Sequence, residues 1–244
     1  WHHVVAVRDR NAGAAGQNLL YVDGKLDVAA LNVVYNTGFD STADLNIGYW
    51  DFNGTPSFHL DGMLDEVALY DRALDPDEIE DHYDAGLLRQ DYCLGSAPFV
   101  PFPDDTISLW HLDELTLNPG DTGGTYVDSF DGNDGAGNPN PTAVPAPGGV
   151  VNGAQAFDGT AEINVPANYI FDWAVDDSFS IEFWVKRDGA VTNEQVAIGR
   201  YDPTSRWWVG IETTENAASF VLRDIDGAPS SPTLIGTTDI TDNQ

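Results

Sequence analysis

The segment DGMLDEVALYDRALDPDEIEDHYDAG, residues 61–86, joins a strand pattern directly to a helix pattern. Its first part, DGMLDEVALYD, has the apolar residues of a β-strand. The second part contains Asp75, a good N-cap, followed by Pro76, which fits the first helical position. Glu78 stands three residues after the cap and completes a capping box. The segment therefore predicts a strand that leads into one short helix over residues 75–85.

The rest of the chain carries strand signals separated by turn signals, with almost no further helix pattern. In NLLYVDGKLDVAA the dipeptide Asp23-Gly24 stands between apolar runs and predicts a two-residue β-hairpin. Residues 179–186 alternate between two faces, which predicts a half-buried antiparallel strand. One face contains Phe179, Ile181, Phe183 and Val185, and the other contains Ser180, Glu182, Trp184 and Lys186. Many short strands of this kind predict an all-β sandwich.

The composition is strongly acidic, with 40 Asp and Glu against 10 Lys and Arg and a formal net charge of −30. Of the acidic residues, 31 are Asp and 9 are Glu. Asp suits turns, where its short carboxylate binds nearby backbone groups or a hard cation such as Ca²⁺. The bias therefore fits either Ca²⁺-compatible loops or a salt-adapted surface on a turn-rich fold. We expect no direct binding to nucleic acid or to an anionic membrane, because both carry the same sign of charge.

Cys93 is the single cysteine, so no internal disulfide is expected. It begins the stretch CLGSAPFVPFPDD, which has three prolines and no periodicity. This composition predicts an extended linker over residues 93–106. No apolar run reaches the length of a membrane-spanning helix, and no membrane insertion is expected.

Two sets of segments resemble one known family of domains. The segments LWHLDE, DSFDGNDG, GAQAFDGTAEINVP and FSIEFWVKRDG resemble the N-terminal half of the laminin-G-like, concanavalin A-like jelly-roll domains. The segments WHHVVAVRD, LLYVDGKLD, LNIGYW and GMLDEVALYDRALDPDEI resemble the C-terminal half of the same domains. Such domains are common as repeats in large bacterial and archaeal surface proteins. The resemblance implies an antiparallel jelly-roll β-sandwich with one short C-terminal helix.

The two halves stand in reverse order along this chain. Residues 1–92 resemble the end of one domain, and residues 107–244 resemble the beginning of the next. We therefore expect the chain to be one period of a tandem array, cut out of phase with its domains. Three arrangements fit: neighbouring sandwiches of a longer chain, separate chains that complete one another, or a single chain that closes as a circular permutant.

The loop DSFDGNDGAGN is a candidate Ca²⁺ site. Its candidate ligands are Asp128, Asp131, Asn133 and Asp134. Ca²⁺ takes six to eight oxygen ligands, and the glycines of the loop let backbone carbonyls turn inward. The loop is not an EF-hand loop, because Gly135 stands where the fifth position needs an oxygen ligand. The alternative is that these side chains only form Asx-turns.

Asp65 gives a second indication of a metal site. Strict alternation places it on one strand face with Met63, Val67 and Leu69, and a carboxylate on an apolar face is costly unless it is paired or coordinated. The resemblance implies the same, since in related sandwiches the Asp at the start of the last strand helps to hold a structural Ca²⁺. The alternative is that Asp65 only accepts backbone hydrogen bonds. The remaining candidate ligands are Asp113 and Asp158.

Aromatic side chains offer a third kind of site, for stacking on a sugar ring. Trp207 and Trp208 are neighbours on a strand and face opposite ways, so one of them is expected in the core. The candidates for stacking are Tyr49, Trp50 and Trp208. The alternative is that all seven tryptophans fill or cover the sandwich.

No catalytic pattern is evident. Related hydrolases place their carboxylates on one strand as Glu-x-Asp-x-Glu, and the chain has no such run. In the nearest match, IETTE, Glu212 and Glu215 point to opposite faces of a strand. The five histidines are scattered and are expected to be packing residues. We therefore expect a protein without enzymatic activity.

These features predict a structural or adhesive repeat unit of a large extracellular, cell-surface protein or fibre, stabilised by Ca²⁺. Its expected partners are neighbouring copies of itself. The alternative is a glycan-binding module of a secreted or cell-surface protein. A rim pocket with an exposed aromatic side chain and several polar groups would favour the glycan-binding module. A large apolar contact between successive copies would favour the fibre.

Overall fold

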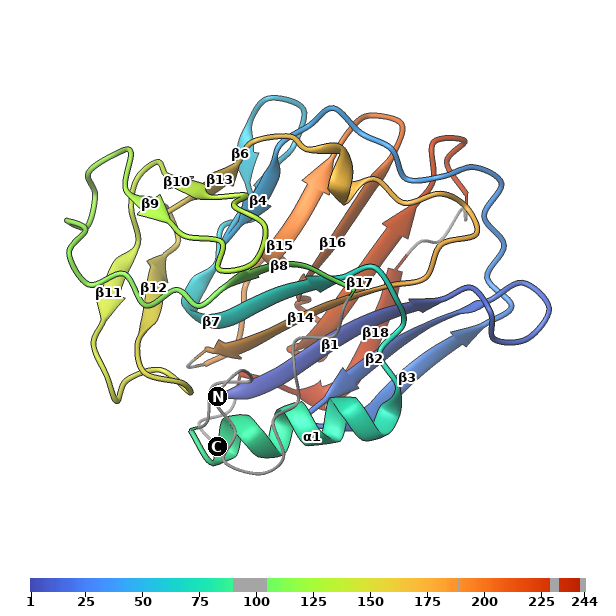
Figure 1. The fold of residues 1–244 in the computed structure, drawn as a ribbon, viewed down its shortest axis with the longest axis horizontal. Helices are drawn as coiled ribbons and strands as arrows, with labels where there is room; N and C mark the ends of the chain where they lie inside the picture. Colours follow the sequence, from blue (N-terminus) through green and yellow to red (C-terminus); the bar gives the residue numbers. More distant parts are fainter. Residues whose placement is uncertain (90–104, 188, 229–232, 242–244) are drawn as a thin grey trace.

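The computed structural model describes residues 1–89, 105–187, 189–228 and 233–241. Most of the predicted linker, residues 93–104 with Cys93, lies outside the described residues. Two eight-stranded antiparallel sheets face each other and enclose the core (Figure 1). The described residues contain one α-helix, α1 (Pro76–Leu87). The prediction of an all-β, antiparallel jelly-roll sandwich with one short helix is confirmed.

Sheet A contains the first and the longest strands. Its order is β11-β12-β7-β14-β1-β2-β3, and β8 also pairs with β7. The strands are β1 (His2–Asp9), β2 (Gln17–Val22), β3 (Lys25–Leu31), β7 (Asp61–Tyr70), β8 (Thr106–Trp110), β11 (Thr142–Val144), β12 (Ala154–Asp158) and β14 (Phe179–Lys186). The β2–β3 turn is the predicted hairpin, with left-handed φ values of 51° at Asp23 and 73° at Gly24.

Sheet B lies opposite and has the order β18-β17-β16-β15-β4-β13-β10-β9. The strands are β4 (Leu45–Ile47), β9 (Thr125–Tyr126), β10 (Gly135–Gly137), β13 (Ile163–Val165), β15 (Gln195–Tyr201), β16 (Arg206–Ile211), β17 (Ala217–Arg223) and β18 (Thr233–Asp239). A separate small hairpin joins β5 (Trp50–Asp51) and β6 (Pro56–Ser57).

Both predicted half-domains contribute strands to each sheet. In sheet A, β14 from the second half pairs with β1 and with β7 from the first half. In sheet B, β4 from the first half pairs with β13 and with β15 from the second half. In this structure, strands from both halves therefore lie in one sandwich, and the domain division at residues 1–92 and 107–244 stays a prediction. Completion by a neighbouring repeat or by a second chain stays a prediction.

Large aromatic side chains fill the space between the sheets. Trp173 stacks on Phe179 with ring centroids 3.9 Å apart, and it also contacts Trp207. Trp207 is 1% exposed and belongs to this core, whereas Trp208 points to the outer face of sheet B. One of the two neighbouring tryptophans is therefore in the core, as predicted.

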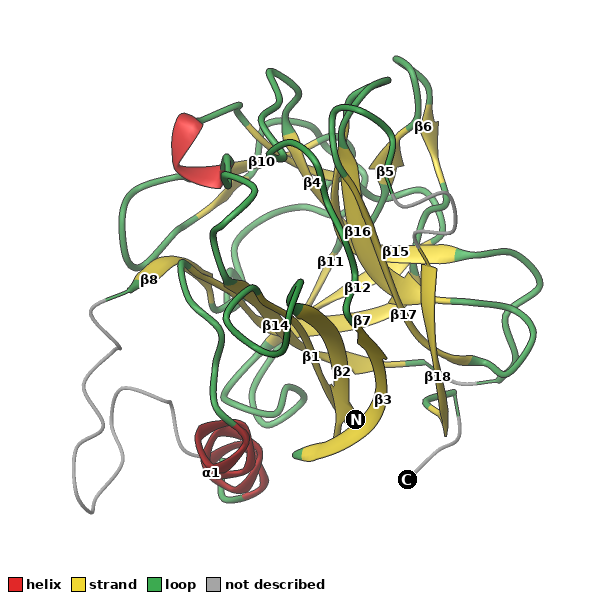
Figure 2. Ribbon diagram, turned by 90° about the vertical axis from the view of Figure 1, so that its right-hand side faces the viewer, coloured by secondary structure: helices red, strands yellow, loops and turns green. Residues whose placement is uncertain are grey.

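Helix α1 covers the outer face of sheet A (Figure 2). Ser180, Glu182 and Trp184 lie on that face and are at most 1% exposed. The prediction of a half-buried β14 is therefore wrong, because the helix and a loop bury its second face. No helix among the described residues is long and apolar enough to cross a membrane.

The start of α1 differs from the prediction in one detail. Asp75 is the N-cap, and its Oδ1 accepts a hydrogen bond from the backbone N–H of Glu78 at 3.0 Å, as expected. The side chain of Glu78 binds the guanidinium of Arg72 and forms no return bond to the cap. Only half of the capping box is therefore present, because an ion pair holds its second member.

Candidate functional site

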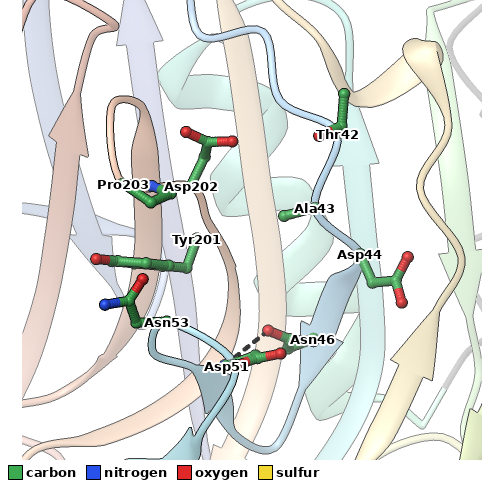
Figure 3. A pocket seen from close by; sticks show the side chains of 10 residues that line it. Thr42, Ala43, Asp44, Asn46, Asp51, Asn53, Tyr201, Asp202 and Pro203 are labelled. Atoms are coloured by element: carbon green, nitrogen blue, oxygen red, sulfur yellow. Dashed lines mark hydrogen bonds between the residues drawn. The ribbon is translucent and has the colours of Figure 1, made fainter.

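A polar pocket of about 270 Å³ lies where β4 begins and β15 ends, at two neighbouring strands in the middle of sheet B. Three segments that are distant in the sequence meet there: the residues that lead into β4, the β5–β6 turn and the β15–β16 turn. The lining residues are Thr42, Ala43, Asp44, Asn46, Asp51, Asn53, Gly54, Tyr201, Asp202 and Pro203. In Figure 3, Asn53, Tyr201 and Asp202 lie on one side and Ala43 and Asp44 on the other, with Asn46 and Asp51 below.

The β5–β6 turn forms one wall because its sequence requires a tight reversal. Asn53 and Gly54 have left-handed φ values of 62° and 79°, which an Asn-Gly hairpin turn needs. Phe52 and Thr55 exchange backbone hydrogen bonds of 3.0 and 3.2 Å across the turn. This hairpin geometry holds Asn53 against the pocket. The same three residues, Asn53-Gly54-Thr55, also have the form of an N-glycosylation sequon.

Asn46 fixes the lower part of the pocket. It is 1% exposed, and its Oδ1 accepts a hydrogen bond from the backbone N–H of Asp51 at 2.9 Å. Its Nδ2 donates to the hydroxyl of Tyr49 at 2.9 Å and to Oδ1 of Asn164 at 3.1 Å. Oδ1 of Asp51 is buried, and no donor among the described residues lies within hydrogen-bond distance of it. Asp51 therefore lines the pocket with a carboxylate that has one buried, unpartnered oxygen.

Hydrogen bonds hold the other two carboxylates of the pocket, Asp202 within its own turn and Asp44 by residues of β13 and of the segment that follows it. Oδ1 of Asp202 accepts hydrogen bonds from the backbone N–H of Thr204 at 3.0 Å and from its hydroxyl at 2.7 Å. These bonds lower the pKa of Asp202, so it is an anion at neutral pH. The carboxylate of Asp44 points away from Tyr201 in Figure 3 and accepts from Asn164 and Ala167.

An aromatic cluster supports the pocket from the outer face of sheet B. Tyr201 packs edge-on against Trp50 and tilted against Phe52, each with ring centroids 4.9 Å apart. Phe52 is 43% exposed, whereas Tyr49, Trp50 and Trp208 are each 5% exposed. The three side chains predicted to stack on sugars are therefore covered. The rings near the surface at this place are Phe52 and Tyr201.

The predicted Ca²⁺ loop folds around Asp128 as a hydrogen-bond acceptor. Asp128 is 5% exposed, and its Oδ1 accepts from the backbone N–H groups of Leu109 at 2.9 Å and Phe130 at 3.0 Å. Its Oδ2 accepts from the backbone and side-chain N–H groups of Asn133 at 3.0 and 3.1 Å. Oδ1 of Asp134 accepts from the N–H of Asp128 at 2.9 Å. These contacts are those of the alternative to a Ca²⁺ site, in which the side chains form Asx-turns.

A β-bulge in β7 moves Asp65 off the face where strict alternation places it. Leu64 and Val67 both contact the core between the sheets, although three positions separate them. The left-handed Glu66, with a φ of 49°, adds one residue to β7 opposite β14. Asp65 therefore faces the outer side of sheet A. The prediction that it shares a face with Val67 and Leu69 is wrong for this reason.

On that outer side, Asp65 is fully buried beneath a loop. Its Oδ2 accepts hydrogen bonds from the backbone N–H groups of Val150 at 2.7 Å and Val151 at 3.0 Å. Asp113 binds the same loop, since its Oδ1 accepts from the N–H of Gly153 at 2.6 Å. Among the described residues, no donor reaches Oδ1 of Asp65. Burial and neighbouring carboxylates raise the pKa of Asp65 to about 8.

The predicted metal ligands thus fall into separate places. Asp65 and Asp113 hold one loop, and Asp128, Asn133 and Asp134 form another, with Asp131 exposed beside them. Asp158 stands apart and accepts hydrogen bonds from Thr160 and Ala161 in its own turn. In the part of the chain that the structure describes, no three His, Cys, Asp or Glu side chains are grouped so that they could hold a metal ion.

Comparison with known proteins gives one match. Residues 1–80 match the family model of the concanavalin A-like lectin/glucanases superfamily, of the laminin-G type. The matched part runs from β1 through β7 into the first turn of α1. No curated protein and no solved structure matched the chain. The sandwich and the matched segment together support a lectin-like or adhesive module.

Proposed function

We propose that the protein is a non-catalytic, lectin-like module that binds glycans in the pocket between β4 and the β5–β6 and β15–β16 turns. The observation that carries this proposal is the pocket lining itself, in which Asn46, Asp51 and Asp202 lie around the ring of Tyr201. Ligand sites place a few oriented polar groups beside aromatic side chains. A sugar ring presents hydroxyl groups that donate to carboxylates and C–H faces that pack on aromatic rings.

The size of the pocket fits a small ligand. Its volume of about 270 Å³ lies just below the range of drug-sized sites and suits a single sugar ring. The chemistry argues for binding without hydrolysis, because a glycosidase needs a carboxylic acid that supplies a proton. The pKa of Asp202 is lowered, so this carboxylate is unsuited to that role. We place the module in an extracellular, cell-surface protein, where such domains are typical.

A structural role in a tandem array or fibre is the second candidate. It is supported by the order of the half-domains and by the exposed edge of sheet A at β3. Leu26 and Leu31 of β3 are 53% and 66% exposed, and an unpaired edge strand can pair with another chain. The partner in this case is a neighbouring copy of the same protein.

We also propose a structural Ca²⁺ at the loop that Asp65 and Asp113 bind. The unpartnered, fully buried Oδ1 of Asp65 supports it, because a buried carboxylate oxygen needs a donor or a cation. Ca²⁺ takes carboxylate and backbone carbonyl oxygens, and Asp113 lies near enough to affect the charge state of Asp65. Its role would be to hold the loop on sheet A.

A blocking variant tests glycan binding directly. Thr42 is an exposed residue of the pocket lining, so Thr42→Trp should fill the pocket without disturbing the core. We expect a glycan array to identify ligands of the unmodified protein, and calorimetry to show at least about tenfold weaker binding by Thr42→Trp. Chromatography of the incubated glycan should show no hydrolysis products.

The matched control is Thr213→Trp, which places the same ring at an exposed turn outside the pocket. It should bind as the unmodified protein does, and both variants should keep the same unfolding temperature. Equal binding by Thr42→Trp, or no glycan bound on the array, would contradict the proposed site. Filaments seen by electron microscopy, without glycan binding, would support the second candidate.

A further inference from the structure

The pocket is lined by carboxylates and by no basic residue. Asp44, Asp51 and Asp202 are among its ten lining residues, and none of the ten is Lys, Arg or His. The two amide side chains, Asn46 and Asn53, are neutral. Any ligand that enters therefore meets a negative potential, which the net charge of −30 reinforces at long range.

Arg200 is next to the pocket in the sequence but does not face it. It is 1% exposed, and its guanidinium donates to the backbone carbonyl oxygens of Ser41, Ala43 and Phe171. It also forms an ion pair with Asp172. Because these partners occupy the guanidinium, it is not available to neutralise an anion bound beside Tyr201. Its charge is balanced by Asp172, and neither residue lines the pocket.

The charged groups that line the pocket, Asp44, Asp51 and Asp202, are hydrogen-bond acceptors. Oδ1 of Asp51 is buried and has no donor among the described residues. Asp202, on the opposite side, is an anion because Thr204 stabilises its charge. A ligand must therefore bring donors, which hydroxyl and ammonium groups supply and which carboxylate or sulfate groups do not. An anionic group here would be desolvated next to like charges.

We propose that this pocket selects sugars by charge, binding neutral and amine-bearing hexoses and excluding uronic, sialic and sulfated sugars. The inference rests on the proposed function and names the ligand class of the same pocket. Asp51 and Asp202 are the residues that determine this specificity. A neutral hexose donates its hydroxyl groups to them, and an ammonium group adds a charge attraction.

The test compares sugars of one ring configuration that differ in one substituent, which is neutral, cationic or anionic. The probes are glucose, glucosamine and glucuronate, and the corresponding galactose and mannose series, titrated by NMR in 50 and 300 mM NaCl. In the series that binds, we expect the uronate to bind at least about tenfold more weakly than the neutral hexose. The amine should bind more tightly than the neutral hexose, and its advantage should shrink in high salt.

Two variants separate the pocket from the charge of the whole molecule. Asp202→Asn removes one pocket charge with little change of shape, whereas Asp81→Asn removes one charge from the exposed side of α1. We expect Asp202→Asn to lower the ratio of the dissociation constants, uronate over neutral sugar, at least about threefold. Asp81→Asn should leave this ratio unchanged. A uronate that binds as tightly as its neutral parent would overturn the charge selection and leave glycan binding intact. Absence of binding by every sugar would overturn the proposed function itself.

Discussion

The two sheets are covered on their outer faces in different ways. Over sheet A, helix α1 is held by a buried network around a carboxylate, in which one atom, Nδ1 of His3, has no hydrogen-bond partner among the described residues. Glu182 is fully buried and binds Nε2 of His3 at 2.6 Å, Nδ1 of His82 at 3.0 Å and the hydroxyl of Tyr70 at 2.8 Å. Over sheet B, the β5–β6 hairpin is held mainly by aromatic contacts.

The cover of sheet B leaves polar atoms without partners. Trp50, Trp208, Val196 and Val221 form its apolar cluster, with Phe58 and Tyr201 packed against them. Nε1 of Trp50 and Oδ1 of Asp51 are buried, and neither has a hydrogen-bond partner among the described residues. The difference teaches where binding belongs. A network around a buried charge fixes the cover of sheet A in place, whereas polar residues at the margin of the sheet B cover line a pocket.

The largest expected effect is at the centre of the sheet A network. Glu182→Gln leaves two buried histidines without their charge partner, and loss of one partner of a buried pair costs about 3–5 kcal/mol. We expect urea unfolding to show this loss in the free energy of unfolding. The control is Glu80→Gln on the exposed side of α1, with an effect within about 0.5 kcal/mol. A loss below about 1 kcal/mol in Glu182→Gln would show that apolar contacts alone hold the helix.

An intermediate effect is expected from Ca²⁺ at the second cover of sheet A, the loop over Asp65. Ca²⁺ at about 100 times its Kd should stabilise the fold by about 2.7 kcal/mol relative to EDTA. Asp65→Asn should abolish this stabilisation, because Asn removes the charge that the cation needs. Asp158→Asn, at an exposed turn, should retain it. Equal stability in Ca²⁺ and EDTA would mean that Asp65 anchors the loop through hydrogen bonds alone.

The smallest expected effect is a pH dependence of the helix cover. Burial alone would lower the pKa of His82, but the charge and hydrogen bonds of Glu182 outweigh it and raise the pKa above 6.5. This stabilisation is fully present below pH 6.5 and is lost as the pH rises through the folded pKa. Burial opposes ionisation of Glu182, but His82 and His3 outweigh it and lower its pKa. The stabilisation that ionised Glu182 contributes is present above about pH 4.5 and is lost as the pH falls.

The helix cover should therefore be most stable between about pH 4.5 and 6.5. His82→Gln should destabilise the protein more at pH 5.5 than at pH 8, by about 1 kcal/mol in urea unfolding. Phe52→Ala, in the cover of sheet B, should lower the free energy of unfolding equally at both pH values, because no histidine belongs to that aromatic cluster. A pH-dependent destabilisation by Phe52→Ala, or a pH-independent destabilisation by His82→Gln, would contradict the contrast between the two covers.

Local signals explain what the sequence could predict. Asp75 and Pro76 set the start of the helix, and Asp23-Gly24 set a hairpin, because caps and tight turns depend on a few adjacent residues. The burial of Glu182 was not predictable from alternation alone, since it depends on where the helix docks. The bulge at Glu66 was missed for a similar reason: one left-handed residue reverses the faces of a strand.

The pocket was harder to predict than the fold. Its residues come from segments near positions 42, 53 and 202, which only the completed sheet B brings together. One signal was available, since Asn53-Gly54 is a strong hairpin dipeptide. The stacking prediction failed to anticipate that this hairpin would cover Trp50 and Trp208. The histidines, expected only to pack, also pair with carboxylates, as His59 does with Glu162.

The placement of β14 between β1 and β7 has a consequence for synthesis of the protein. His2 of β1 pairs with Val185 of β14, so within this sandwich β1 cannot complete its pairing until residues 179–186 have been made. Until β14 is made, a growing chain therefore carries β1 and β7 with the edges that pair with β14 still open. Such long-range closure slows folding, because the entropy of a long loop must be lost before its contacts form. The nascent chain is thus the form of this protein that is most exposed to association with other chains.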